Sequence, residues 1–415
     1  MLKRSGVGAL ALLLAHAGPV SAGYGVFAHG YGLKSEGAGG VAVARAEDTP
    51  AMAANSAAVL SLGRRFDLGL DWLYVEAGSA IGGNAFGAND AYRSDGQAHF
   101  FIPQGGWSTP LGDRAAIGVT VFGAGFGTDY KRSPYARFGG SDRAGIKLMQ
   151  SVVSTSMAYA VVPGQNVGVG LNLAYQEINA KGLGFLAPVS QSPAQVSDQG
   201  SDSEFGYSLQ IGWQGRLSEQ LDSGIAWRSP TRLGKFRRYR GLLPNGGQLD
   251  LPAILGLGLR YQATPVLSFS VDFSRVEFSG QDATGNPASR LAQGRLLGSD
   301  GGPGFGWRDQ DIYKFGFAWD VRPGLRLRAG YSRSSEIMPP SETFFGMAAP
   351  LVMKEHYTLG TTQSLAGGWE ITGVSAFVPR SRVAGSGSIP AAFGGGEADI
   401  HVQQIITGLS LGKRF

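Results

Sequence analysis

The chain has 415 residues, a hydrophobic content of 43% and a mean hydropathy of −0.03, values unlike those of a protein that spans a membrane with apolar helices. Its formal net charge is +5, and its basic residues do not alternate with aromatic ones, so the composition argues against nucleic-acid binding. There is no cysteine, which suits an envelope protein without disulfides but also describes many cytosolic proteins.

Residues 1–22 are predicted to be a secretory signal peptide. Lys3 and Arg4 form a positive start, and an apolar run over residues 7–14 follows that is too short to span a bilayer. Val20-Ser21-Ala22 supplies a small-residue cleavage site and places the mature start near Gly23. The alternative is a buried N-terminal helix. No run of about 20 apolar residues follows, so we expect export without a helical anchor.

Residues 23–63 are predicted to be a separate unit, because they do not share the alternating pattern of the rest of the chain. The stretch 30–63 is rich in Gly and Ala and too weakly amphipathic for a strand. It is either a flexible leader or a segment that folds inside the structure formed by residues 64–415.

From about Phe66 onward, every second residue of successive short segments is apolar or aromatic. Segment 167–176 places Val167, Val169, Leu171, Leu173 and Tyr175 on one face, and small or polar residues on the other. A period of two indicates a β-strand. Strands of about ten residues with an apolar outside and a polar inside are typical of a transmembrane β-barrel. The expected location is therefore the outer membrane of a Gram-negative cell.

Fourteen strands are predicted, and they lie at residues 65–77, 97–109, 114–127, 146–162, 165–178, 203–217, 220–232, 248–263, 266–278, 309–320, 324–334, 354–366, 369–380 and 399–414. Long connections follow the odd strands and short turns follow the even ones, which is the rule for outer-membrane barrels. The predicted fold class is thus all-β, a 14-stranded antiparallel transmembrane barrel. A soluble β-sandwich or propeller would not explain an aromatic face on nearly every strand.

The ends and loops of the predicted barrel indicate its surroundings. Phe415 is in register with Leu409 and Leu411 on the lipid face and resembles the terminal signal read by the barrel assembly machinery. The basic run 235–240 falls in a predicted outer loop, where it either contacts anionic lipopolysaccharide or is simply solvated. We expect a monomer.

Several predicted outer loops carry apolar side chains that a solvated loop does not need. These side chains either form a hydrophobic capture surface or merely pack the loops against one another. They are Phe185, Leu186, Leu242, Leu243, Phe344, Phe345, Met347 and Leu351.

The third predicted strand loses its alternation near its end. Its pattern breaks into a glycine-rich run that contains Gly123, Gly125 and Gly127. Glycine inside a strand marks either a bulge or bend, or a rim of small residues.

Motifs along the mature chain resemble those of the FadL/TodX family of outer-membrane transporters for long-chain fatty acids and other hydrophobic compounds. They are a Gly-rich stretch at 37–44, the acidic pair Glu47-Asp48, the turn Asn55-Ser56-Ala57, and the blocks 251–279, 307–334 and 355–362. The family has proline where this chain has Ser56. Proline would fix φ and remove a donor, so the geometry of this turn is open.

The resemblance implies that residues 23–63 form a hatch, or plug, inside the barrel. It also implies capture of a hydrophobic ligand among the outer loops and sideways release through a gap at the kinked third strand. A fatty acid would need a cation for its carboxylate. Among the inward-facing basic residues, Arg228 and Lys314 are the candidates, because Arg326 and Arg328 lie near the periplasmic end. No cofactor or metal is implied.

The remaining alternatives come from other functional classes. Five scattered histidines give no metal-ligand spacing, and neither a G-x-S-x-G elbow nor a P-loop is present, so an enzyme is not expected. A general diffusion porin, a structural or adhesive barrel, and uptake of alkanes or aromatic hydrocarbons instead of fatty acids stay open.

Overall fold

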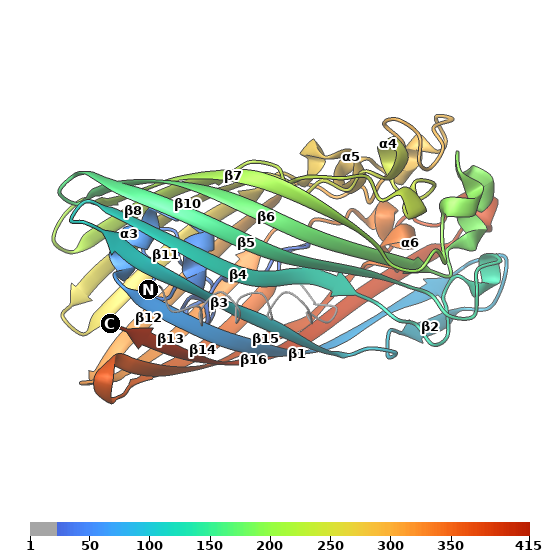
Figure 1. Ribbon diagram of the computed structural model, residues 1–415. Helices are drawn as coiled ribbons and strands as arrows, with labels where there is room; N and C mark the ends of the chain where they lie inside the picture. Colours follow the sequence, from blue (N-terminus) through green and yellow to red (C-terminus); the bar gives the residue numbers. More distant parts are fainter. Residues whose placement is uncertain (1–22) are drawn as a thin grey trace.

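The computed structural model describes residues 23–415, and these form one closed antiparallel β-barrel (Figure 1). The predicted signal peptide lies outside the described residues. Sixteen strands make one sheet, in which β2 (Asp90–Arg93) pairs with β1 and β9 (Arg232–Leu233) pairs with β7 as short additions. The other fourteen form the wall, so the predicted fold class is confirmed.

The wall strands follow one another around the barrel in chain order. They are β1 (Arg65–Gly82), β3 (His99–Leu111), β4 (Ala115–Gly127), β5 (Gly145–Val162), β6 (Gln165–Lys181), β7 (Asp202–Arg216), β8 (Leu221–Arg228), β10 (Ile254–Thr264), β11 (Leu267–Val276), β12 (Gln310–Arg322), β13 (Leu325–Ser334), β14 (Glu355–Ser364), β15 (Trp369–Val383) and β16 (Glu397–Arg414).

The helices among the described residues are short and lie outside the wall strands. Before β1 they are α2 (Leu33–Glu36), η1 (Pro50–Ala53), η2 (Ser56–Ala58) and α3 (Val59–Leu62). In the connections they are η3 (Ala136–Phe138), η4 (Gly184–Val189), η5 (Pro193–Gln195), η6 (Arg237–Tyr239), α4 (Pro244–Gly247), η7 (Phe278–Gly280), α5 (Asp282–Gly285), η8 (Ala288–Arg290), η9 (Pro340–Glu342), α6 (Thr343–Gly346), η10 (Ala366–Gly368) and η11 (Ala391–Phe393). No helix within residues 23–415 has the length and apolarity needed to cross a membrane.

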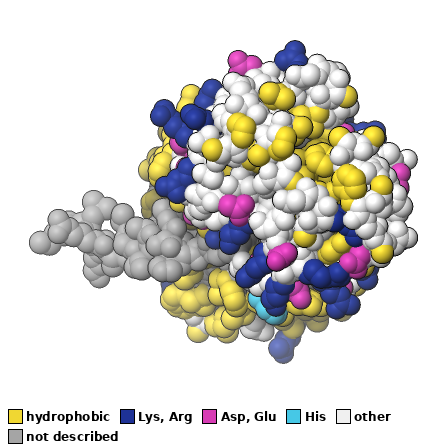
Figure 2. Space-filling model, turned by 90° about the vertical axis from the view of Figure 1, so that its right-hand side faces the viewer, with side chains coloured by type: hydrophobic (Ala, Val, Ile, Leu, Met, Phe, Trp, Pro, Cys, Tyr) yellow, Lys and Arg dark blue, Asp and Glu magenta, His cyan; other side chains and the backbone are white. Residues whose placement is uncertain are grey.

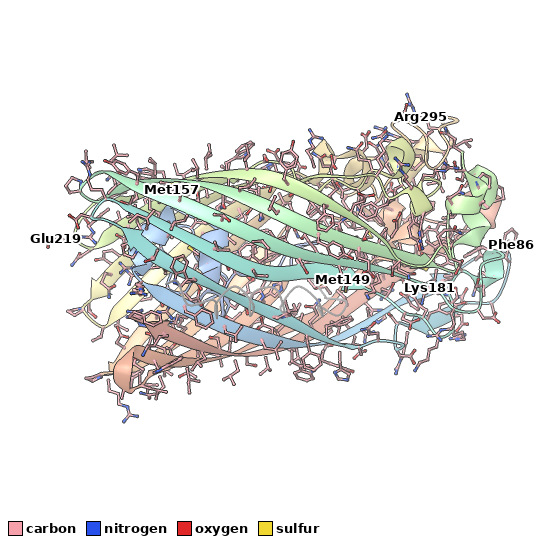
Figure 3. The ribbon with its side chains drawn as sticks, in the orientation of Figure 1. Phe86, Met149, Met157, Lys181, Glu219 and Arg295 are labelled. Carbon is pink, nitrogen blue, oxygen red and sulfur yellow. The ribbon has the colours of Figure 1, made fainter. Side chains whose placement is uncertain are left out.

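The barrel closes where β16 pairs with β1 over the full length of both strands, from Arg65 opposite Arg414 to Gly82 opposite Glu397. Closure leaves no unpaired edge along this seam, which is the condition for a sheet in lipid. The tight turns lie at one end with Glu219, and the long loops lie at the other with Phe86, Lys181 and Arg295 (Figure 3).

The alternating pattern of the sequence separates the two faces of the wall. On β6, Val169 and Leu173 are more than half exposed, whereas Gly168 and Asn172 are buried on the inner side. On β12, Tyr313 and Phe315 face outward and Lys314 is buried inside. Phe415 is 69% exposed at the seam, on the same apolar outer surface as Leu409.

Three predicted strand boundaries differ by four or more residues from the structure. The first strand, expected to end at residue 77, runs to Gly82, and the other two boundaries adjoin a proline. The strand expected at 220–232 ends at Arg228, just before Pro230, and the strand expected at 248–263 begins only at Ile254, after Pro252. Proline lacks the backbone N–H that a ladder needs. Residues 229–253 therefore belong to an outer loop, whose two sides are joined at the base by the isolated bridge between Thr231 and Leu251 and by contacts of Asp250 with Arg232 and Leu233.

The segment before β1 lies against the inner face of the wall. Asp272 of β11 accepts hydrogen bonds from the backbone N–H groups of Ala42 and Val43, at 2.7 and 2.9 Å. A side chain at Gly168 of β6 would place its Cβ 2.4 Å from the backbone nitrogen of Ala57. Glycine on the inner register of the strands thus allows this segment to approach the wall backbone.

Candidate functional site

A cavity of about 60 Å³ lies between the segment before β1 and the inner face of strands β7 to β12. Tyr24, Phe27 and Tyr31 line it from the N-terminal side, and Arg228 and Lys314 line it from the wall. The two predicted carboxylate-binding cations therefore border the same space. We call this the inner cavity.

Arg228, at the end of β8, is buried against two aromatic rings of the inner cavity. Its guanidinium carbon lies 5.4 Å from the centre of the Phe27 ring and 5.8 Å from that of Tyr31, and its Nη2 donates to the Tyr31 hydroxyl at 3.0 Å. It forms no ion pair with a carboxylate among residues 23–415. A buried cation without a carboxylate partner is unfavourable unless a ligand supplies the negative charge.

Lys314, on β12, is already occupied by the chain itself. Its Nζ donates to the carbonyl oxygens of His29 and Gly40, at 3.0 and 3.1 Å, and Asp272 is its direct cross-strand neighbour. Burial, together with the nearby ammonium group, lowers the pKa of His29 to about 4, so its imidazole is neutral. Lys314 thus anchors the N-terminal segment, and Arg228 is the cation left available to a ligand.

A second apolar pocket, of about 50 Å³, lies among the outer loops. Five of the eight predicted loop residues line it: Phe185, Leu186, Leu242, Leu243 and Phe345. The other three, Phe344, Met347 and Leu351, are buried in the apolar core beside it. The face that carries these loops mixes hydrophobic and charged side chains at its surface (Figure 2). We call this space the outer pocket.

The rings around the outer pocket contact one another. Phe185 stacks on Tyr135 with ring centres 5.1 Å apart, and Phe344 meets Phe138 edge to face at 5.2 Å. Phe393, from the loop before β16, lies 5.5 Å from both Phe185 and Phe344. The apolar loop residues therefore both pack the loops together and line a pocket.

The acidic pair Glu47-Asp48 faces basic groups of the barrel wall and of the segment itself. Glu47 pairs with Arg326, at 3.1 Å, and with Arg328. Burial alone would raise the pKa of Glu47, but the two guanidinium groups hold it well below its usual range. Asp48 accepts the backbone N–H of Lys34 at 3.0 Å.

The Asn55-Ser56-Ala57 turn begins η2 and contacts the inner wall. Asn55 caps this helix, because its side-chain oxygen accepts the N–H of Ala57 at 3.0 Å. Its amide donates to the carbonyl oxygens of Val43 and Trp213, at 2.8 and 3.0 Å, which ties the turn to β7. Ser56 is fully buried, and its hydroxyl has no hydrogen-bond partner among the residues that the structure describes.

The ladder between β3 and β4 is interrupted on the side of the outer loops. It runs only from Leu111 opposite Ala115 to Gly105 opposite Val121. Beyond that point residues 122–127 of β4 pair only with β5, and residues 99–104 of β3 pair only with β1. Gly123, Gly125 and Gly127 all lie in this stretch of β4, which does not pair with β3, and the ribbons of the two strands separate there (Figure 1).

A small cavity of about 30 Å³ adjoins this interruption. Ile102 and Gly123 line it from the wall, and Ala28 and Tyr31 line it from inside. The same Ala28 and Tyr31 also line the inner cavity, so they separate the two spaces. Tyr31 packs edge to face on Phe122 of β4, with ring centres 4.8 Å apart.

A family model described as "Outer membrane protein transport protein (OMPP1/FadL/TodX)" matches residues 32–339. The chain belongs to this family. It is an outer-membrane channel for hydrophobic compounds and not an enzyme. The resemblance and the predicted location are therefore confirmed. No curated protein sequence matches the chain.

Solved structures share the fold at low sequence identity. The P. putida toluene transporter TodX is 17% identical, over 93% of this chain and 99% of its own, with a TM-score of 0.69. A Pseudomonas aeruginosa FadL homologue is 15% identical, over 94% and 99%, with a TM-score of 0.69. The Ralstonia pickettii toluene transporter TbuX is 18% identical, over 93% and 99%, with a TM-score of 0.65.

Residues that the sequence did not single out also shape this family member's cavities. Tyr24, Phe27 and Tyr31 line the inner cavity, and Asp272 holds the backbone of the N-terminal segment. Three aromatic residues in a Gly- and Ala-rich stretch were the available signal. The predicted contacts with lipopolysaccharide and the assembly machinery, and the monomeric state, stay predictions.

Proposed function

We propose that this channel takes up hydrophobic compounds that carry a carboxylate, long-chain fatty acids being the type case. The ligand is captured in the outer pocket, held in the inner cavity by Arg228, and released sideways between β3 and β4. Residues 23–63 close the lumen as a hatch, so the ligand does not pass straight through.

Arg228 is the residue that favours a substrate with a carboxylate over a neutral hydrocarbon. Its guanidinium group is buried in a largely apolar, aromatic cavity and has no carboxylate partner among the described residues. A neutral hydrocarbon would leave this charge unpaired, whereas a fatty acid supplies a carboxylate that arginine binds with two parallel hydrogen bonds. The rings of Phe27 and Tyr31 suit the first methylene groups of the same ligand.

The arrangement of the cavities supports the sideways route. The inner cavity and the small cavity beside Ile102 and Gly123 share two lining residues, Ala28 and Tyr31. That cavity lies at the stretch where β3 and β4 share no hydrogen bonds. A ligand that displaced Tyr31 would join the inner cavity to the small cavity. The apolar chain of the ligand would then reach the lipid side of the wall.

The decisive experiment compares charged and neutral ligands on the same protein. Arg228→Gln should weaken oleate binding about 30-fold or more, because a buried charge pair loses one partner. Toluene binding should stay within about twofold, since no charge is involved. Equilibrium binding to the purified protein in detergent measures both, and Arg228→Lys should recover most of the oleate affinity.

Uptake of neutral aromatic hydrocarbons is the second candidate, favoured by the apolar lining of the outer pocket. Oleate affinity that is unchanged in a folded Arg228→Gln protein would rule out the carboxylate assignment and select this alternative. A general diffusion porin is a third possibility, and passage of small sugars in a liposome swelling assay would reveal it.

A further inference from the structure

A polar cavity of about 390 Å³ lies at the turn end of the barrel, beneath the N-terminal segment. Pro265, Gly324 and Ser364, next to the tight turns, line it on the wall side, and Ser61 and Leu62 line it from α3. The turn end faces the periplasm in an outer-membrane barrel. We call this space the periplasmic vestibule.

The side chains of the vestibule carry an excess of positive charge. Its acidic side chains number three: Glu47, Asp320 and Glu370. Its basic side chains number seven: Lys34, Arg45, Arg65, Arg260, Arg326, Arg328 and Arg414. Among the described residues, the lining thus has an excess of four positive charges, and the excess is two when Asp67 and Asp222, which pair with lining arginines from outside the cavity, are included.

Two of the three lining carboxylates are shared by more than one cation, and the third, Asp320, pairs with Arg326. Glu370 pairs with Lys34, Arg65 and Arg414, at 2.5, 2.7 and 3.3 Å. Glu47 pairs with both Arg326 and Arg328. These acids are therefore already engaged and leave no spare negative charge for the remaining basic groups.

Arg260 depends on a carboxylate that is shared in the same way. Its Nη1 lies 3.5 Å from Asp222, which also lies 3.4 Å from Arg45 and 3.9 Å from Arg216. The Arg260 side chain is only 11% exposed. Because three guanidinium groups share Asp222, the positive charge of the largely buried Arg260 is only partly compensated.

Among the described residues, Arg65 lacks a hydrogen-bond acceptor for one nitrogen of its guanidinium group. Its side chain is 1% exposed, and although it binds Asp67 and Glu370, its Nη1 has no hydrogen-bond partner within residues 23–415. A guanidinium group presents five donors in a fixed plane, a geometry that matches the oxygens of phosphate and carboxylate. Arg65 lines the cationic cavity, so an oxyanion bound there would add negative charge beside its buried guanidinium group.

We propose that the periplasmic vestibule is a binding site for a small oxyanion of the phosphate type. The anion bridges basic groups of the N-terminal segment, such as Lys34, and basic groups of the wall, such as Arg260. Its binding therefore favours the seated position of that segment, because a ligand stabilises the state to which it binds. This inference does not depend on the identity of the hydrophobic substrate.

The vestibule does not belong to the hydrophobic route. Most of its lining side chains are polar or charged, whereas the outer pocket and the inner cavity are lined mostly by apolar and aromatic side chains. An acyl chain would displace water from charged groups there without replacing their hydrogen bonds. A hydrated or multiply charged anion fits this lining.

The test is calorimetric titration of inorganic phosphate into the full mature chain in zwitterionic detergent, with sodium chloride of equal ionic strength as the reference. Arg260→Gln should weaken phosphate binding roughly tenfold. Arg414→Gln, whose side chain is 61% exposed and so tolerates replacement, should weaken it in the same direction. Hydrogen exchange of residues 34–47 should slow in phosphate relative to chloride in the parent protein.

Arg216→Gln is the matched control. Arg216 touches the same Asp222 and carries the same charge, but it is 65% exposed and does not line the vestibule. Its replacement should change phosphate affinity by less than about twofold. Absence of saturable phosphate binding, unchanged affinity in both vestibule variants, or an equal loss in the control would overturn the proposal.

The phosphate group could come from a free ion or from a lipid headgroup of the inner leaflet. Titration with monomeric dihexanoyl phosphatidic acid separates these sources. Affinity similar to that of inorganic phosphate assigns the free ion. Affinity at least about tenfold higher, lost in Arg260→Gln, assigns the headgroup.

Discussion

Ser56 occupies the first position of η2, where the family has proline, and the structure indicates that proline would fit. Asn55 before it is extended, with φ −154° and ψ 114°, as the residue before a proline must be. The Ser56 backbone N–H donates no hydrogen bond to any described residue, so nothing is lost with it. The first helical position is also where proline is best tolerated.

We therefore expect Ser56→Pro to leave the protein intact and to stabilise it by about 0.5 kcal/mol, because proline lowers the entropy of the unfolded chain. Denaturant unfolding followed by tryptophan fluorescence measures the change. The matched variant Ala57→Pro should destabilise the protein, since the Ala57 N–H is bonded to the Asn55 side chain. A loss of more than about 1 kcal/mol in Ser56→Pro would contradict this account.

Asp48 makes the stability of the folded N-terminal segment dependent on pH. It is buried, and one of its oxygens has no hydrogen-bond partner in the described part of the chain. Burial, together with the nearby Asp67, raises the pKa of Asp48 to about 6. The folded state binds this proton more tightly than the unfolded chain does. The contribution of Asp48 to the free energy of unfolding is therefore largest below pH 4 and is lost as the pH rises through 6.

Asp48→Asn should remove this loss, since the asparagine keeps an acceptor for the Lys34 N–H without a charge. At pH 7.5 we expect it to stabilise the segment by about 1–3 kcal/mol, and at pH 4 by close to nothing. Hydrogen exchange of residues 32–58 at both pH values measures the difference. Equal pH dependence in the parent and the variant would show that Asp48 is not the titrating group.

Among the strands, β4 borders the proposed sideways exit, and two of its glycines differ in what they allow. Gly125 has φ +145°, and a Cβ there would lie 2.2 Å from the Leu148 carbonyl oxygen, so only glycine fits this bend. Gly123 is different, because its Cβ would meet Ile102 at 3.2 Å and nothing closer. A side chain at Gly123 therefore fills the space beside β3 without breaking β4.

Gly123→Val should cut hydrophobic uptake at least about fivefold if release is sideways, while ligand affinity stays within about twofold. Uptake of labelled ligand by intact cells, compared with binding to purified protein, measures the two effects separately. Gly373→Val in β15 is the control, since a Cβ there meets only Thr361 at 3.8 Å. Normal uptake in Gly123→Val would place the exit elsewhere.

At the scale of the whole molecule, the wall and the N-terminal segment have separate sources of stability. Every wall strand is paired on both sides over at least part of its length, and β16 seals the barrel against β1. The segment depends on the wall instead, through contacts such as those of Asp272 and Asn55. The wall does not need the segment to complete its ladders.

Deletion of residues 24–60 should therefore leave a folded barrel that leaks small polar solutes. The barrel should still migrate differently on gels before and after heating, because closed sheets resist detergent. Liposome swelling with small sugars measures the leak. Deletion of residues 293–295, exposed in an outer loop, should cause no leak; a truncated barrel as tight as the parent would show that the segment is not a plug.

The sequence alone determined the strand number, the two faces of each strand and the location of the protein. Alternation is a local property, since each residue of a wall strand points inward or outward by its position in that strand. Pro230 and Pro252 are also visible in the sequence. They shorten the neighbouring strands to Arg228 and Ile254, which is more than the alternation alone predicts. The glycine run of β4 was recognised as a break in the pattern.

Only the tertiary structure decided what the inner residues do. Arg228 and Lys314 are equivalent inward cations in the sequence, and they differ because His29 and Gly40, nearly 300 residues before Lys314, bring carbonyl oxygens to one of them. The partners of Glu370 come from both ends of the chain. Such contacts depend on the closure of the barrel and the seating of the N-terminal segment, and no local pattern of residues encodes them.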